Sequence, residues 1–117
     1  MCSFFGPSDM LLQHASDPSV VEDLMGGGPT GRGELYRMAS PLALVTPAAA
    51  PHLLAHGNAD DIVLPGHSTA FAAALHAAGV EVRLLELPGI GHDGHTLYGA
   101  EEVKSEVLDF FTRHLNP

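Results

Sequence analysis

The sequence of residues 51–65, PHLLAHGNADDIVLP, holds the pattern on which the fold prediction depends. Its apolar run at 52–56 is bounded by a proline and a glycine, which is typical of a short buried strand. Two aspartates, Asp60 and Asp61, follow in a polar loop. Because open α/β sheets bind their ligands beyond the carboxyl ends of parallel strands, we expect this loop to carry functional carboxylates.

A helix and a second strand follow this loop. Residues 68–78 are rich in alanine, carry apolar side chains at helical spacing and end before Gly79, which predicts a helix with a glycine cap. Residues 82–87 form the next apolar run and lead into the loop PGIGH, which ends at His92. The order strand, aspartate loop, helix, strand, histidine loop makes Asp60 and His92 candidates for one site.

Further segments complete the predicted fold. Residues 2–5 are apolar and stop at a Gly-Pro pair, which indicates a strand, and Asp17 followed by proline is typical of a helix start. The last segment has apolar residues on one helical face, glutamates at its start and basic residues at its end, as the helix dipole favours. We therefore predict an α/β fold with a parallel sheet and right-handed crossovers. The strands are predicted at 2–5, 52–56 and 82–87, and the flanking helices at 18–25, 68–78 and 100–115.

The composition restricts the partners that the chain can bind. Its 117 residues include 14 acidic and 5 basic residues, for a net charge of −9. Nucleic acids and anionic membrane surfaces require a basic face, so neither is an expected partner. Cys2 is the lone cysteine and cannot form an intramolecular disulfide, so nothing requires an oxidising compartment. Since no apolar run reaches transmembrane length, we expect a soluble cytoplasmic protein.

The strand predicted at 2–5 would lie at an edge of the sheet. An apolar strand with an unpaired edge is prone to pair with another chain. The sequence therefore predicts a homo-oligomer, most simply a dimer joined through the 2–5 edge.

Several stretches of the sequence resemble the C-terminal third of an α/β-hydrolase. They read FGPSD at 5–9, ASPL at 39–42, HGNADDIV at 56–63 and GIGH at 89–92. The resemblance is to esterases of the feruloyl and acetyl-xylan esterase and lipase-like type, which are related to the prolyl oligopeptidase catalytic domain. It implies a single C-terminal α/β-hydrolase-like domain over 1–117 that hydrolyses small carboxylic esters without a cofactor.

The resemblance also implies roles for two loop residues. Asp60 would be the acid of a Ser-His-Asp triad and His92 its general base. This chemistry needs an imidazole that takes a proton from a serine and a carboxylate that holds the tautomer of that imidazole. Asp61 is the rival for the acid, but the spacing to Val63 in the motif His-Gly-x-x-Asp-x-x-Val favours Asp60.

The nucleophile of this family is missing from the pattern. It occupies a Gly-x-Ser-x-Gly turn upstream of the other two triad members, and no such turn occurs in this sequence. The chain therefore resembles a hydrolase interrupted after its serine. Ser8 and Ser68 are the remaining candidates within the chain; otherwise a second chain would supply the serine, or the Asp-His pair would activate water directly. The alternative is an inactive hydrolase fragment or an assembly module that homodimerises.

A metal site is the competing interpretation of the histidine loop. His92 and His95, with Asp60 or Asp61, are ligand types that a divalent ion uses. They lie in a glycine-containing loop without a helix to align them, so we predict no metal. Further histidines are predicted at exposed positions, namely His52, His67, His76 and His114.

Overall fold

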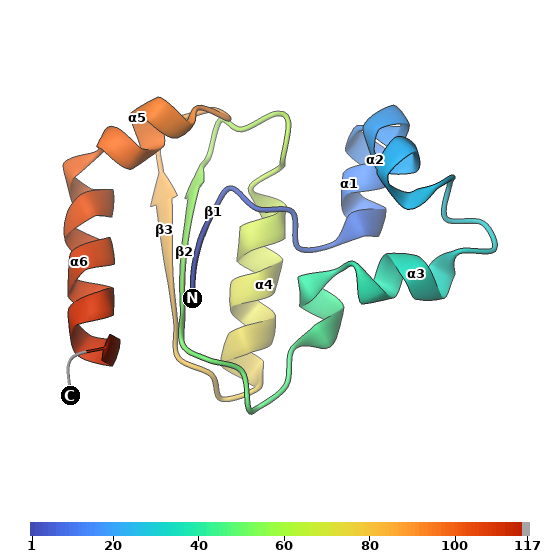
Figure 1. The fold of residues 1–117 in the computed structure, drawn as a ribbon. Coiled ribbons are helices and arrows are strands. Elements are labelled where there is room, and N and C mark those ends of the chain that lie inside the picture. Colours follow the sequence, from blue (N-terminus) through green and yellow to red (C-terminus); the bar gives the residue numbers. More distant parts are fainter. Residues whose placement is uncertain (116–117) are drawn as a thin grey trace.

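The structure is a computed structural model that describes residues 1–115. A short strand and a group of helices precede the main β-α-β unit, and further helices follow it (Figure 1). The elements are β1 (Cys2–Phe4), α1 (Met10–Ser16), α2 (Pro18–Met25), α3 (Gly33–Met38), the 3-10 turn η1 (Pro41–Leu44), β2 (His52–Gly57), α4 (Gly66–Ala77), β3 (Val82–Leu87), α5 (Gly94–Gly99) and α6 (Glu101–Leu115).

The strands form one parallel sheet in the order β1-β2-β3. Cys2 lies opposite Leu53 in the first pair, and His52 lies opposite Val82 in the second. The predicted α/β fold with three parallel strands is therefore confirmed. β1 ends one residue earlier than predicted because Phe5 leaves the extended conformation, with a φ of 42°.

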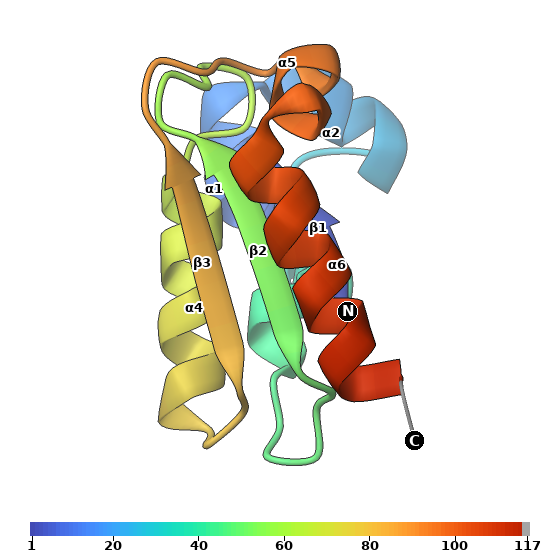
Figure 2. The same cartoon turned by 90° about the vertical axis from the view of Figure 1, so that its left-hand side faces the viewer.

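Helices cover both faces of the sheet. In Figure 2, α6 lies in front of the sheet and α4 lies behind it. On the α4 face, Leu54 packs with Phe71 and Leu75. On the α6 face, Leu53 packs with Phe110. Every residue of β2 is buried, as expected for a central parallel strand covered on both sides.

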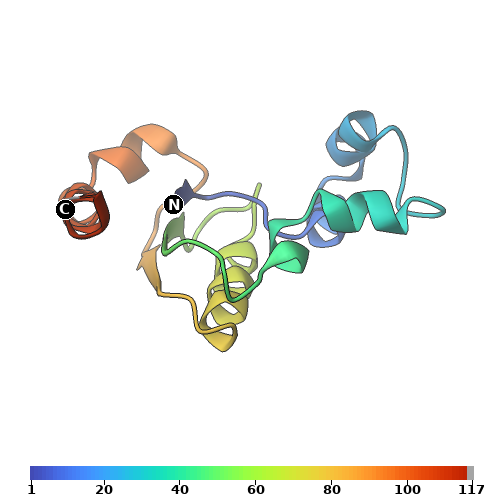
Figure 3. The same cartoon turned by 60° about the horizontal axis from the view of Figure 1, so that its bottom comes forward.

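The helices α1, α2 and α3 form a second, smaller packing unit. They lie on the opposite side of the sheet and of α4 from α6, which makes the molecule elongated (Figure 3). Met10, Val21 and Tyr36 are buried against one another at their centre. The predicted start of α2 is confirmed: the Asp17 side chain accepts from the N–H of Val20 and caps the helix.

The structure corrects two helix predictions. The helix predicted at 68–78 begins earlier, at Gly66, directly after a proline. The segment after His92 was predicted as a loop, but α5 forms there because the Asp93 side chain accepts from the N–H of Thr96 and caps its first turn. The final helix then begins at Glu101.

An apolar hollow lies beside the edge strand β1. Its volume is about 390 Å³. It is lined by Phe4, Tyr98, Val103, Lys104, Val107, Leu108 and Phe111. Within residues 1–115, no strand pairs with the outer edge of β1, and none of the helices in this part of the chain has the length and hydropathy needed to span a bilayer.

Candidate active site

The loops that follow β2 and β3 meet at the carboxyl edge of the sheet. The N–H of Asn58 donates to the Leu87 carbonyl, and the N–H of Ala59 donates to the Ile90 carbonyl, each at 3.0 Å. Gly57 permits this approach, because a Cβ at that position would overlap the Ile90 carbonyl oxygen. The contact sets the two candidate loops side by side.

Asp60 and His92 are in direct contact at this edge. Nδ1 of His92 lies 2.8 Å from Oδ2 of Asp60, whose side chain is fully buried, while 28% of the His92 side chain is exposed. A carboxylate oxygen only accepts, so Nδ1 of His92 carries the proton and Nε2 is left as an acceptor. Within residues 1–115, no group hydrogen-bonds this Nε2. An imidazole held in this tautomer can take up a proton at Nε2.

The second oxygen of Asp60 is held by its own loop. Oδ1 accepts from the N–H of Ile62 at 3.0 Å and from the N–H of Val63 at 2.9 Å. Burial alone would raise the pKa of Asp60, but the hydrogen bonds from His92 and from these N–H groups hold it below its ordinary value. The carboxylate is therefore ionised as well as fixed in orientation.

The rival residues lie outside this contact. Asp61 is exposed, and its side chain makes no hydrogen bond within the part of the chain that the structure describes. His95 is also exposed, in the first turn of α5. The structure thus brings together Asp60 and His92 but neither of these two.

Phe5 forms an aromatic contact with His92 that was not predicted. Its ring centroid lies 4.4 Å from that of the imidazole, with the ring planes at 59°. The N–H of Phe5 still donates to the Ala55 carbonyl at the end of the β1–β2 ladder. The stretch FGPSD contains Phe5, but no sequence pattern indicates that a phenylalanine adopts a positive φ.

The sequence of the chain is similar to those of known proteins. The sequence profile of the prolyl oligopeptidase family matches residues 3–117. The chain belongs to the prolyl oligopeptidase family. Esterase LipC of Mycobacterium tuberculosis is 40% identical to it over 68 residues, which is 57% of this chain and 17% of LipC.

Solved structures of esterases and peptidases share the fold of this family member. A truncated form of a carbohydrate esterase from gut microbiota matches 96% of the chain with a TM-score of 0.81 and 27% identity. A puromycin-hydrolyzing peptidase of Mycobacterium tuberculosis matches 98% with a TM-score of 0.81 and 28% identity. An acylaminoacyl peptidase of Pyrococcus horikoshii matches 96% with a TM-score of 0.77 and 28% identity. The predicted resemblance to α/β-hydrolases is confirmed.

The chain is short beside the proteins that it resembles. The matched part makes up 41% of the carbohydrate esterase and 18% of the puromycin-hydrolyzing peptidase. It makes up 17% of LipC. These three proteins thus carry this unit within a larger chain.

The candidate nucleophiles of this family member are both buried and bonded elsewhere. Ser68 is 5% exposed, and its Oγ lies 2.7 Å from Nδ1 of His56. Ser8 is 2% exposed, and its hydroxyl donates to the carbonyl of His67 at 2.7 Å. Neither hydroxyl bonds His92, so the structure does not bring a serine of this chain to the imidazole.

His67 is fully buried, so its predicted exposure is wrong. Its Nδ1 accepts from the N–H groups of Ser8 and Asp9, and its Nε2 donates to the Gln13 side chain at 3.0 Å. The amide of Gln13 in turn donates to the carbonyl of Ile62, in the loop of the candidate acid. Burial lowers the pKa of His67 below its ordinary value. The segment 8–13 is thus fastened to both α4 and this loop.

The other histidines divide between exposed and buried positions. His76 is exposed as predicted, on α4. His52 is 6% exposed, contrary to the prediction, because it packs edge-on against Phe71 under α4. Across residues 1–115, no cluster of three or more histidine, cysteine, aspartate or glutamate side chains has the geometry to hold a metal ion.

Proposed function

We propose that this chain supplies the acid and the general base for hydrolysis of a carboxylic ester. The observation that carries the proposal is the 2.8 Å hydrogen bond between His92 and the buried, ionised carboxylate of Asp60. The likeness to esterases supports an ester as the substrate class.

In this reaction His92 Nε2 accepts the proton of an attacking hydroxyl, while Asp60 stabilises the imidazolium that forms. The oxygen of this hydroxyl bonds to the ester carbonyl carbon, and His92 then returns the proton to the alkoxide leaving group as the ester C–O bond breaks. Where the hydroxyl is that of a serine, a water molecule activated by His92 in the same way hydrolyses the acyl-serine that remains. Because Ser8 and Ser68 are buried and bonded away from His92, the attacking hydroxyl is that of a serine on a second chain or of a water molecule.

The test uses a fluorophosphonate serine probe and p-nitrophenyl ester turnover. The probe is applied to the purified chain alone and to the chain in extract from its own source, and the modified residue is identified by mass spectrometry. We expect turnover that His92→Ala abolishes and His95→Ala preserves, because His95 lies in the same region but does not contact Asp60. An absence of both labelling and turnover in the wild-type chain and in the extract would rule out the hydrolase.

A second function, assembly into a homodimer through the 2–5 edge, is favoured by the exposed apolar surface beside β1. Leu108 and Phe111 of α6 are 68% and 39% exposed and line the hollow next to this strand. We expect light scattering to give twice the chain mass of 12.3 kDa. Leu108→Glu should then yield monomers, while Leu24→Glu, at an equally exposed position on α2, should not. A wild-type monomer at micromolar concentration would exclude this assembly.

A further inference from the structure

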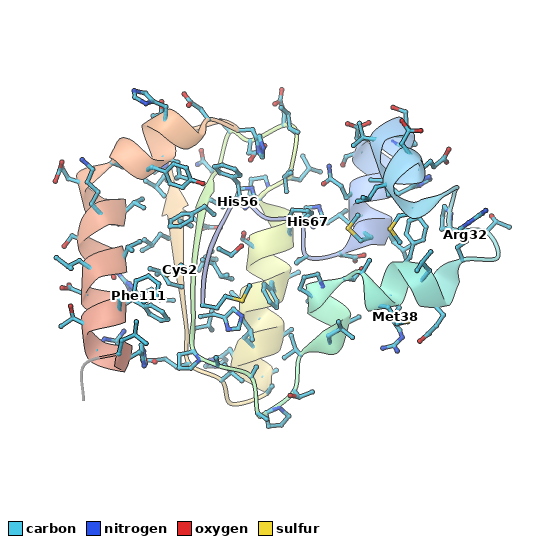
Figure 4. All side chains as sticks on the ribbon, in the orientation of Figure 1. Cys2, Arg32, Met38, His56, His67 and Phe111 are labelled. Atoms are coloured by element: carbon cyan, nitrogen blue, oxygen red, sulfur yellow. The ribbon has the colours of Figure 1, made fainter. Side chains whose placement is uncertain are left out.

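The proposed reaction leaves one buried histidine at the same site unused. His56 lies at the carboxyl end of β2, faces the first turn of α4 and is 1% exposed (Figure 4). Its Nδ1 lies 2.7 Å from Oγ of Ser68. Its Nε2 lies 2.7 Å from the carbonyl oxygen of Val63 and 3.2 Å from Oδ2 of Asp60.

These partners define which nitrogen of His56 carries the proton. A carbonyl oxygen only accepts, so Nε2 bears hydrogen and its N–H donates to Val63, while Oδ2 of Asp60 lies 3.2 Å from the same nitrogen. In the neutral imidazole Nδ1 is then an acceptor, and the hydroxyl of Ser68 donates to it. The hydrogen bonds therefore run in one direction, from Ser68 through His56 to the carbonyl of Val63, in the loop that carries Asp60.

This chain of bonds ends on Val63, the residue whose N–H donates to the carboxylate of Asp60. Oδ2 of Asp60 accepts from His92 and lies 3.2 Å from Nε2 of His56, while Oδ1 accepts from two backbone N–H groups of its own loop. The carboxylate thus has three donors and no exposed side-chain surface, and each donor favours its ionised form. His67 is the other buried histidine near this group, and it is bonded to Gln13 and to the 8–9 backbone instead.

We propose that His56 and Ser68 are positioning residues for Asp60, which fix its loop and so aim its carboxylate at His92 through the bond from Ser68 Oγ to His56 and the bond from His56 Nε2 to the Val63 carbonyl. The inference rests on the proposed function for its meaning in catalysis. The structural relationship itself is tested without any substrate.

A catalytic role for Ser68 is the competing interpretation, because a serine is here bonded to a histidine that lies 3.2 Å from an aspartate. The hydroxyl faces a histidine that is 1% exposed, and Ser68 itself is 5% exposed on the sheet-facing side of α4. An ester cannot reach this hydroxyl while α4 is packed on the sheet. Ser68→Ala should therefore leave any fluorophosphonate labelling of the protein unchanged, and labelling of Ser68 itself would overturn the positioning role.

The main test compares His56→Phe with His52→Phe in the full chain. Both replace a buried imidazole on the same face of β2, but His52 bonds only the Ala50 carbonyl and does not contact a carboxylate. Carbon-13 NMR of the Asp60 carboxyl group follows its titration in each variant. We expect His56→Phe to move the pKa of Asp60 to higher pH and His52→Phe to leave it unchanged. An equal change in the pKa of Asp60 in both variants, or no change in either, would show that His56 only fills space.

Two further measurements guard against a variant that fails to fold. Long-range proton–nitrogen NMR of the wild-type chain should show His56 protonated at Nε2, and the opposite tautomer would contradict the proposal. His56→Gln keeps a hydrogen-bond donor, so the pKa of Asp60 in this variant should lie between its wild-type and His56→Phe values. Ser68→Thr keeps the hydroxyl and should leave the pKa of Asp60 unchanged, while Ser68→Ala should raise it slightly. Because no ester is involved, these results stand apart from any failure of the hydrolase test.

Discussion

The aromatic ring of Phe5 lies against the imidazole of His92, with 4.4 Å between the ring centroids, although Phe5 holds a backbone φ of 42°. A positive φ is uncommon for a bulky residue and costs about 1–3 kcal/mol. The surrounding structure compensates for this strain, and the ring covers one side of the candidate general base. Strained residues of this kind cluster at functional sites.

Phe5→Ala should destabilise the fold by about 1–3 kcal/mol, because it removes a half-buried aromatic ring. The His92 ring should also lose its fixed orientation, seen as altered line widths of its NMR signals. Phe111→Ala, at a 39% exposed position on α6, is the control and should leave the His92 signals unchanged. An unchanged His92 signal in Phe5→Ala would contradict a role for the aromatic contact.

Phe5→Gly should be at least as stable as Phe5→Ala in denaturant unfolding. Glycine elsewhere in a regular element is less stable than alanine by about 0.5–1 kcal/mol, but it adopts a positive φ without strain. The usual order of the two variants is therefore reversed at this position. If alanine proves the more stable, the backbone at Phe5 is not strained in solution.

Gly57→Ala should destabilise the protein by about 3 kcal/mol or more, because the new Cβ would overlap the Ile90 carbonyl and push apart the loops of Asp60 and His92. Gly66→Ala is the matched control, since a Cβ there meets no atom within 4 Å. It should be neutral or stabilising by up to about 1 kcal/mol. Urea unfolding of both variants checks this, and equal losses would contradict the close approach.

The buried carboxylate of Asp60 should make stability depend on acid pH. Its folded pKa is lowered, so its contribution is complete above the unfolded aspartate pKa of about 3.9 and is lost as pH falls from there through the folded value. Asp60→Asn should be destabilised by about 1–3 kcal/mol at neutral pH and should show a flatter acid limb. Asp61→Asn, at the exposed neighbour, should keep the wild-type slope. Urea midpoints between about pH 2 and 6 measure both.

His67 should make the stability of the fold depend on pH in a second range, nearer neutrality. Its pKa is lowered by burial, so the unfolded chain binds more protons, and stability should fall as pH drops below the unfolded histidine pKa of about 6.5. His67→Gln should be less stable at pH about 8 by roughly 1–3 kcal/mol and should lose this slope. His76→Gln, on the exposed side of α4, should retain it. Identical slopes in both variants would assign the effect to other groups.

The parts of the fold that the sequence predicted have local causes. β2 and β3 follow from apolar runs bounded by proline and glycine, and α2 follows from its Asp-Pro start. The pairing of Asp60 with His92 follows from their places after consecutive parallel strands, because the carboxyl ends of such strands share one edge.

The parts that were missed depend on contacts between distant residues. The burial of His67 results from residues 8–13 folding back over α4, which no local pattern at His67 reveals. The polar stretch after His92 was predicted to be a loop because its aspartate and glycine favour turns as much as a helix cap. The contact between His56 and Ser68 joins a strand to a helix 12 residues later, and only the packed geometry defines it.

The sheet order also has a consequence for the sequence of events during folding. β2, α4 and β3 are consecutive in the chain, whereas Cys2 pairs with Leu53 across a separation of about 50 residues. The long loop makes the closure of β1 the slower event, so we expect β1 to dock onto an already formed β-α-β unit. Cys2 lies in β1, and burial raises the pKa of its thiol. Pulsed thiol labelling during refolding would therefore report, through the lone cysteine of the chain, the moment at which the edge strand joins the sheet.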